Sequence, residues 1–141
     1  MKKQIRHLAE IIFEEQDSNL IIIAARAFMR KTLLSIHLTH YFIMEGKNSY
    51  FSMKLPSRRL MRYLLFINTN IALEKIKQDN LSDTELDKLA RTSSKLNRLP
   101  LSIYDGSTFS VETIIEKVLE LKNTNGFDLL FIDYLQLLKL Q

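Results

Sequence analysis

Short apolar segments alternate with longer segments of helical periodicity along this chain. The first apolar segment, residues 20–25, reads LIIIAA, which is typical of a strand that is buried on both faces of a parallel sheet. Further strands are expected at residues 49–53, 101–104 and 129–132. Because amphipathic helices are expected between them, the sequence predicts an α/β fold with helices flanking a parallel sheet.

Turn and capping residues set the bounds of the helices. Gly46 ends a helix that begins at residue 31, and Pro56 begins one that runs to about residue 68. Ser82 and Glu85 have the spacing of a capping box at the start of a helix over residues 82–96. A fourth helix is expected at residues 110–123.

Composition excludes several classes of protein. The chain has 141 residues, 46% of them hydrophobic, which suits one folded domain rather than a disordered segment. There is no cysteine, so disulfides and thiolate metal sites are excluded. No apolar run reaches the ~20 residues of a membrane span, and the N-terminus lacks the pattern of a signal peptide. The net charge of +4 permits contact with phosphate without requiring it.

The first apolar segment leads into a possible phosphate loop. Ligands of parallel α/β sheets lie beyond the carboxyl ends of the strands. Lys31 and Thr32 stand where the pattern G-x-x-x-x-G-K-[ST] places its phosphate-binding lysine and its magnesium-binding hydroxyl. Ala25 and Arg30 occupy the two glycine positions, and Arg30 adds a side chain where the turn is tightest. The alternative interpretation is a strand-to-helix turn that ends in Lys-Thr.

The last apolar segment ends in Asp133. Four apolar residues followed by an aspartate are typical of a Walker B strand, whose carboxylate supports Mg²⁺. Many strands end in aspartate, so the weight of this pattern comes from its position about 100 residues after Lys31 and Thr32.

Four collinear segments resemble DnaB-type replicative DNA helicases. Residues 127–138, FDLLFIDYLQLL, are similar to the Walker B region of that family, and residues 20–32 are similar to its phosphate loop. Residues 51–60, FSMKLPSRRL, resemble the family's F-S-L-E-M-P segment, and residues 100–105 resemble its P-L-x-I-x-D strand. The resemblance extends thinly back to about Ile5.

The resemblance implies a partial RecA-like P-loop NTPase core over residues 20–141, preceded by a degenerate lead-in over residues 1–19. It implies that ATP and Mg²⁺ are the cofactors, with Thr32 and Asp133 serving the metal. DNA and the other subunits of a hexameric helicase are the implied partners, in bacterial cytoplasm or in an organelle. The cofactor-binding segment would comprise Ala25, Arg26, Ala27, Phe28, Met29, Arg30, Lys31 and Thr32.

Departures from the family pattern predict weak or absent nucleotide binding. Ala27, Phe28 and Arg30 stand where the family has proline, serine and glycine. Lys54 occupies the position of the catalytic glutamate that orients water, so no catalytic residue is expected to be intact. The Gly-Gly pair before the first strand corresponds to Phe13–Glu14, and the family arginine falls on Tyr63, beside Arg62.

The family's sensor strand, DNA-binding loops and arginine finger follow Walker B, whereas the sequence here ends at Gln141. The sensor strand lies between the Walker A and Walker B strands in a RecA-like sheet, so we expect a gap at that place. Contact with primase is not expected, because the family's primase-docking domain precedes the motor. Two alternatives to a helicase motor stay open: a non-catalytic module that binds an intact helicase ring, and a decayed gene product.

Two further groups of residues are weaker candidates. His37 and His40 have i, i+3 spacing on a helix but no evident third metal ligand. The basic residues Lys54, Arg58, Arg59 and Arg62 could contact DNA phosphates or form a solvated helix face.

Overall fold

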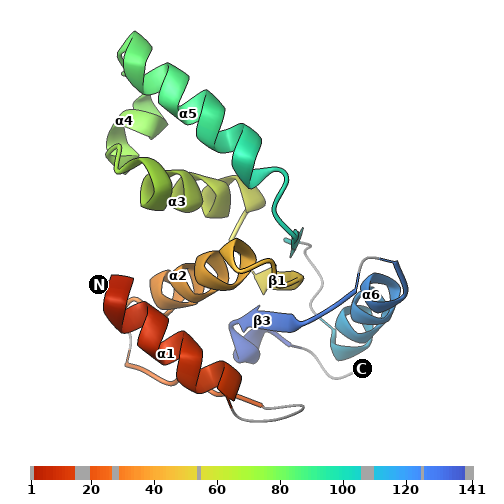
Figure 1. Cartoon of the computed structure of the whole chain (residues 1–141). Coiled ribbons are helices and arrows are strands. Elements are labelled where there is room, and N and C mark those ends of the chain that lie inside the picture. The colour runs from red at the N-terminus through yellow and green to blue at the C-terminus, as the bar shows by residue number, and fades with distance from the viewer. Residues whose placement is uncertain are drawn as a thin grey trace.

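The computed structural model describes residues 2–14, 20–26, 29–53, 55–105, 110–124 and 126–138 (Figure 1). Its elements are α1 (Lys2–Glu14), α2 (Lys31–Met44), β1 (Ser49–Met53), α3 (Ser57–Thr69), α4 (Leu73–Gln78), α5 (Asp83–Leu96), β2 (Leu101–Tyr104), α6 (Val111–Thr124), β3 (Leu129–Asp133) and the 3₁₀ turn η1 (Leu135–Leu137).

The three strands form a parallel sheet in the order β2-β1-β3. Ser49 of the central strand is level with Leu101 on one side and Leu129 on the other. At the amino end of the sheet, the Asp128 carboxylate accepts a hydrogen bond of 2.7 Å from the backbone N–H of Asn48. The predicted strands at 49–53, 101–104 and 129–132 are therefore confirmed, and β3 also includes Asp133.

Helix α2 lies at the centre of the molecule, between α1 and α3 and against β1 and β3 (Figure 1). Its residues Leu38 and Phe42 pack with Ala9 of α1 in one hydrophobic cluster. On its other side Ile36 packs in a second cluster with Leu60 of α3. Because both sides of α2 are covered, its sequence is apolar nearly all round, as expected for a buried helix.

Helices α3, α4 and α5 form a helical unit beyond α2. In Figure 1, α3 and α5 run in opposite directions, with α4 at the turn between them. Leu96 near the end of α5 belongs to the same hydrophobic cluster as Leu60 and Leu64 of α3. The predicted capping box of α5 is present, since the Ser82 hydroxyl accepts from Glu85 N–H and the Glu85 carboxylate accepts from Ser82 N–H.

The predicted strand at residues 20–25 is wrong. Residues 20–26 pair with no strand among the described residues, and all seven are exposed, with Leu20 at 87% and Ile22 at 71% exposure. A strand exists only when a neighbour accepts and donates its backbone hydrogen bonds. Among the described residues no strand pairs with the outer edge of β3, so this apolar segment has no place in the sheet.

Two helices were not predicted from the sequence. Helix α1 forms in the segment expected to be a degenerate lead-in, and its apolar face packs on α2. The short helix α4 connects α3 to α5. The division of the chain at residues 19 and 20 stays a prediction. In the parts of the chain that are described, no helix is both long and apolar enough to cross a membrane.

Candidate nucleotide-binding site

The parallel strands bring three chain segments to one edge of the sheet. β1 ends at Met53, β2 at Tyr104 and β3 at Asp133, and Met53 is level with Asp133 in the register. All three ends lie on the same edge because the strands are parallel. Helix α2 packs against both β1 and β3.

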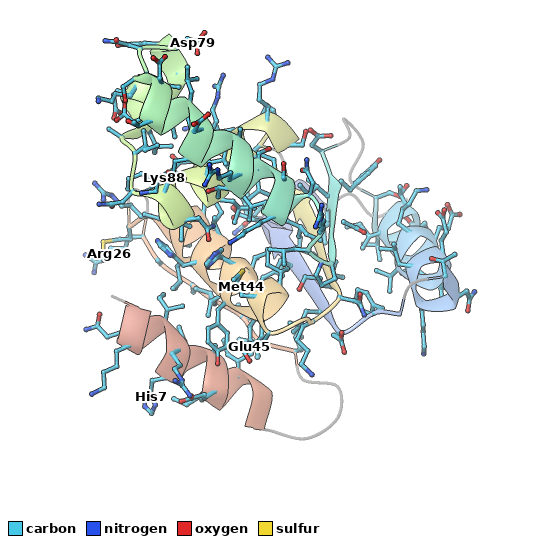
Figure 2. The ribbon with its side chains drawn as sticks, turned by 45° about the horizontal axis from the view of Figure 1, so that its top comes forward. His7, Arg26, Met44, Glu45, Asp79 and Lys88 are labelled. Atoms are coloured by element: carbon cyan, nitrogen blue, oxygen red, sulfur yellow. The ribbon has the colours of Figure 1, made fainter. Side chains whose placement is uncertain are left out.

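The candidate phosphate loop enters α2 as an exposed turn. Ala25 and Arg26 are exposed, and Figure 2 shows Arg26 at the periphery of the molecule. The backbone N–H of Met29 donates to the Arg26 carbonyl over 3.3 Å, which makes a tight turn. Ala27 and Phe28 lie outside the described residues. Residues 20–26, expected to form a buried strand, are therefore open to solvent where they lead toward α2.

Arg30 adopts the backbone conformation for which the family motif uses glycine. Its φ of 56° and ψ of 38° are in the left-handed region, where a side chain costs about 1–2 kcal/mol. Its carbonyl accepts hydrogen bonds from the N–H groups of Leu33 and Leu34 and so begins α2. Arg30 therefore occupies this left-handed turn at an energetic cost.

Lys31 and Thr32 form the first turn of α2 and are both half-buried. This turn holds no acidic residue, and the side chain of the N-cap residue Arg30 makes no capping hydrogen bond. The unpaired N–H groups and the positive end of the helix dipole favour an anion there, and the lysine adds a full positive charge. The local arrangement can hold a phosphate group.

Asp133 is the buried carboxylate at the carboxyl edge of the sheet. Its side chain is 9% exposed and forms neither a hydrogen bond nor an ion pair with any described residue. The peptide bond that follows it is cis. Buried carboxylates are normally paired or bound to a metal. An oxygen ligand with no partner among the described residues, on the strand against which α2 packs, fits Mg²⁺ bound to a nucleotide.

Asp105 is a site residue that the sequence analysis did not single out. It follows β2, and its carboxylate accepts a hydrogen bond of 2.6 Å from the backbone N–H of Ser57 at the start of α3. This backbone hydrogen bond lowers the pKa of Asp105. Two sequence signals could have indicated this contact: Asp105 follows a predicted strand, and Pro56 precedes a predicted helix. The pairing occupies one N–H group at the start of α3.

The remaining candidate residues lie on α2 and α3 or outside the described residues. Lys54 is not among the described residues. The ring Nε2 of His40 is 3.2 Å from Asn68 Oδ1 on α3, and burial lowers the pKa of His37, helped by the charge of His40. No group of three metal-ligating side chains occurs among the described residues. Tyr63 and Arg62, at the position of the family arginine, are half-buried on α3.

Comparison with known proteins gives consistent matches. The family model for the DnaB-like helicase C terminal domain matches residues 1–141. A probable replicative DNA helicase of Guillardia theta is 33% identical over 135 residues, covering 94% of this chain and 22% of that protein. A probable plasmid replicative DNA helicase of Chlamydia psittaci is 30% identical over 122 residues, covering 85% of this chain and 27% of that protein. This chain thus spans about a quarter of the length of the curated relatives it matches.

Solved structures show the same fold. One solved ATPase domain superimposes with a TM-score of 0.74 at 23% identity, over 81% of this chain and 42% of that one. A DnaB-like replicative helicase, solved in a study of its interactions with primase, gives a TM-score of 0.78 at 25% identity. The match covers 86% of this chain and 30% of that one. The predicted fold class, part of a RecA-like core with a parallel sheet flanked by helices, is therefore confirmed.

Proposed function

Since this chain belongs to the family of the DnaB-like helicase C-terminal domain, we propose that it forms the nucleotide-binding portion of the ATP-driven motor of a replicative DNA helicase. The observation that carries the proposal is Asp133, a buried carboxylate without a partner among the described residues, at the carboxyl edge of the sheet. Helix α2, which packs on the strand ending in Asp133, begins with Lys31 and Thr32.

Each residue of the site has a distinct task in this proposal. Lys31 holds the β- and γ-phosphates, and the backbone from Arg26 to Arg30 surrounds them. The Thr32 hydroxyl and the Asp133 carboxylate hold Mg²⁺, whose charge offsets the negative charge that develops on the phosphates during transfer. The wider proposal includes ATP bound between the subunits of a hexamer that unwinds duplex DNA, in bacterial cytoplasm or in an organelle.

We propose that nucleotide binding is weak. Arg30 keeps the left-handed turn at an energetic cost and brings a side chain to the place where phosphate must approach the backbone. Lys54 cannot orient the attacking water as a glutamate does, since a charged lysine accepts no proton. The 141-residue chain alone is therefore expected not to unwind a forked duplex.

Calorimetry with ATP and Mg²⁺ tests the proposal. We expect a dissociation constant well above the low micromolar range for the chain as it stands. Combined reversion of Ala27→Pro, Phe28→Ser and Arg30→Gly should tighten binding, and adding Asp133→Asn to the reverted chain should abolish its dependence on Mg²⁺. Lys77→Ala, on exposed α4, is the control and should change nothing.

Two outcomes would count against the proposal in different ways. Low micromolar binding by the unmodified chain would show that the departures from the loop pattern matter little. A folded reverted chain that still binds no nucleotide would show that this edge of the sheet is not a nucleotide site.

A non-catalytic module that binds an intact helicase ring is the second candidate function. The exposed apolar residues of segment 20–26 and the outer edge of β3, unpaired among the described residues, favour it because such features pair with other chains. A pull-down with an intact replicative helicase tests this function: specific capture that survives Lys31→Ala supports it. A chain that neither binds nucleotide nor captures a helicase would fit a decayed gene product.

A further inference from the structure

Among the described residues, the outer edge of β3 is an open strand edge. The backbone N–H of Leu129 donates to the carbonyl of Asn48, so the backbone groups of Leu129 face β1. Because neighbouring residues of a strand direct their backbone groups to opposite sides, Leu130 and Ile132 direct theirs away from β1. Each of these two residues therefore offers an N–H donor and a carbonyl acceptor to a further strand.

The side chains of β3 do not protect this edge from pairing. Natural proteins usually block an open edge with a lysine, a proline or a bulge. The sequence LLFID of β3 contains neither lysine nor proline, and its pairing with β1 is continuous from Leu129 to Asp133. Leu130 is also 37% exposed and carries no charge. The edge can therefore accept another strand.

Residues 20–25 have the composition of a strand that this edge could accept. Their sequence, LIIIAA, contains three β-branched isoleucines and no charge, glycine or proline. All of them are exposed, and their backbone makes no hydrogen bond with any described residue. The chain thus carries a strand-forming segment and an open strand edge, and it does not join them to each other.

We propose that residues 20–25 of one copy of this chain pair with the outer edge of β3 in a second copy. Each copy has one such segment and one such edge, so two copies that exchange segments satisfy both edges. The pairing is parallel, because the segment is apolar at all its positions, as strands inside parallel sheets are, and the sheet β2-β1-β3 is itself parallel. Exchange also removes from water the side chains of Leu20 and Ile22, which are 87% and 71% exposed.

The exchange is independent of nucleotide binding. It uses backbone hydrogen bonds and apolar side chains, so it needs neither ATP nor Mg²⁺. Two copies are therefore expected to pair in buffer that contains EDTA and no nucleotide. Failure of the nucleotide site leaves this proposal standing, and the reverse also holds.

Disulfide cross-linking between single-cysteine variants tests the proposal in that buffer. The chain has no cysteine, so each variant carries only the thiol that is introduced. Variants with one cysteine at each position from 20 to 25, labelled with a heavy isotope, are mixed with unlabelled Leu130→Cys and oxidised mildly. Mass spectrometry identifies the mixed dimer. Leu86→Cys, at an exposed apolar position on α5, replaces Leu130→Cys in the control mixtures. Circular dichroism verifies that every variant folds.

A disulfide forms only where the two Cα atoms come within ~4.4–6.8 Å, so only the residue opposite Leu130 and its close neighbours can react. We expect a position in the segment that gives several times more mixed dimer with Leu130→Cys than with Leu86→Cys. With Ile132→Cys instead, the best position should move later in the segment, toward Ala25, because the strands are parallel. A move toward Leu20 would overturn parallel pairing. Equal yields with Leu130→Cys and Leu86→Cys would overturn the pairing itself.

Proline substitution separates strand pairing from non-specific apolar association. Ile22→Pro combined with Ile23→Pro removes an N–H donor from the paired side, whichever of the two residues faces β3. Ile22→Val combined with Ile23→Val is the control, because it keeps both N–H groups and most of the apolar surface. Sedimentation velocity should show that the dimer is lost in the proline variant and kept in the valine variant. Equal association of both variants would overturn the proposal, because backbone pairing of this segment would then not hold the copies together.

Discussion

Arg30 carries the clearest mismatch between a side chain and its backbone. Its left-handed conformation disfavours every residue with a Cβ, and asparagine is tolerated there better than arginine. We expect Arg30→Gly to raise the free energy of unfolding by up to about 1 kcal/mol, after the greater freedom of glycine in the unfolded chain is subtracted. The urea midpoint measures this change.

Asn70 at the end of α3 provides the matched control, because its φ of 58° is nearly the same. Asn70→Gly should stabilise the chain less than Arg30→Gly does. A lower midpoint for Arg30→Gly would mean that the arginine side chain makes contacts worth more than the strain of its backbone.

His37 makes stability depend on pH near neutrality. Burial lowers the pKa of His37 below its ordinary value, and the charge of His40 lowers it further. The unfolded chain then binds a proton more readily than the folded chain. Stability is therefore expected to fall as pH drops below about 6.5, the pKa of an unperturbed histidine. Urea midpoints between about pH 7.5 and 5 measure this decline.

His37→Gln should flatten that dependence, whereas His7→Gln on the exposed surface of α1 should leave it unchanged. If the urea midpoint of His37→Gln fell as steeply with pH as that of the unmodified chain, other groups would cause the pH dependence.

At the residue scale, local chemistry was predictable and long-range pairing was not. Asp133 could be selected because it ends an apolar run. The pairing of Asp105 with Ser57 joins residues 48 positions apart, and no local pattern reports such a contact. The left-handed turn at Arg30 was suggested by the glycine in the family pattern, since arginine itself gives no such signal.

The stability of helix α5 depends on interactions at its first turn. The Ser82 hydroxyl accepts a hydrogen bond from Glu85 N–H, and Lys75 of α4 pairs with the Glu85 carboxylate over 2.8 Å. Ser82→Ala removes the cap, and we expect a loss of about 1 kcal/mol in the free energy of unfolding. Ser94→Ala, at an exposed position in the same helix, is the control and should be neutral or slightly stabilising.

The midpoint of thermal or urea unfolding measures both variants. If Ser82→Ala matched the unmodified chain, α5 would be held by its packing against α3 alone.

Elements whose signals are local were predicted well from the sequence. Helices α2, α3, α5 and α6 have caps, stops and a 3.6-residue period, and each was expected within one or two residues of its bounds. The segment at residues 20–25 failed because its apolar composition describes a buried strand, whereas strand formation depends on a neighbour elsewhere in the chain.

Two features of the 141-residue chain favour its association with other chains. The outer edge of β3 has no strand partner among the described residues, and Leu20 and Ile22 are largely exposed. We expect the purified chain to self-associate, with a sedimentation profile that shifts to larger species as concentration rises. Leu20→Lys combined with Ile22→Lys should reduce this association.

Met44→Lys combined with Leu86→Lys is the matched control, because both residues are exposed and apolar but lie outside residues 20–26 and the sheet. If both pairs of substitutions reduced self-association equally, general surface hydrophobicity would be its cause. A compact monomer at all concentrations, with a single cooperative melt, would mean that the strands close the edge in solution, and would favour the module that binds a helicase ring.

The place of β1 in the sheet also sets the order in which the chain can fold during its synthesis. The central strand is made early, yet its partner β3 ends 80 residues later, at Asp133. Helices α1 and α2, and then α3 to α5, have neighbours close in sequence and can pair as they leave the ribosome. β1 must wait, with its backbone unpaired on one side, until nearly all of these residues have been translated. Chaperones that recognise extended segments can therefore bind residues 49–53 throughout this interval.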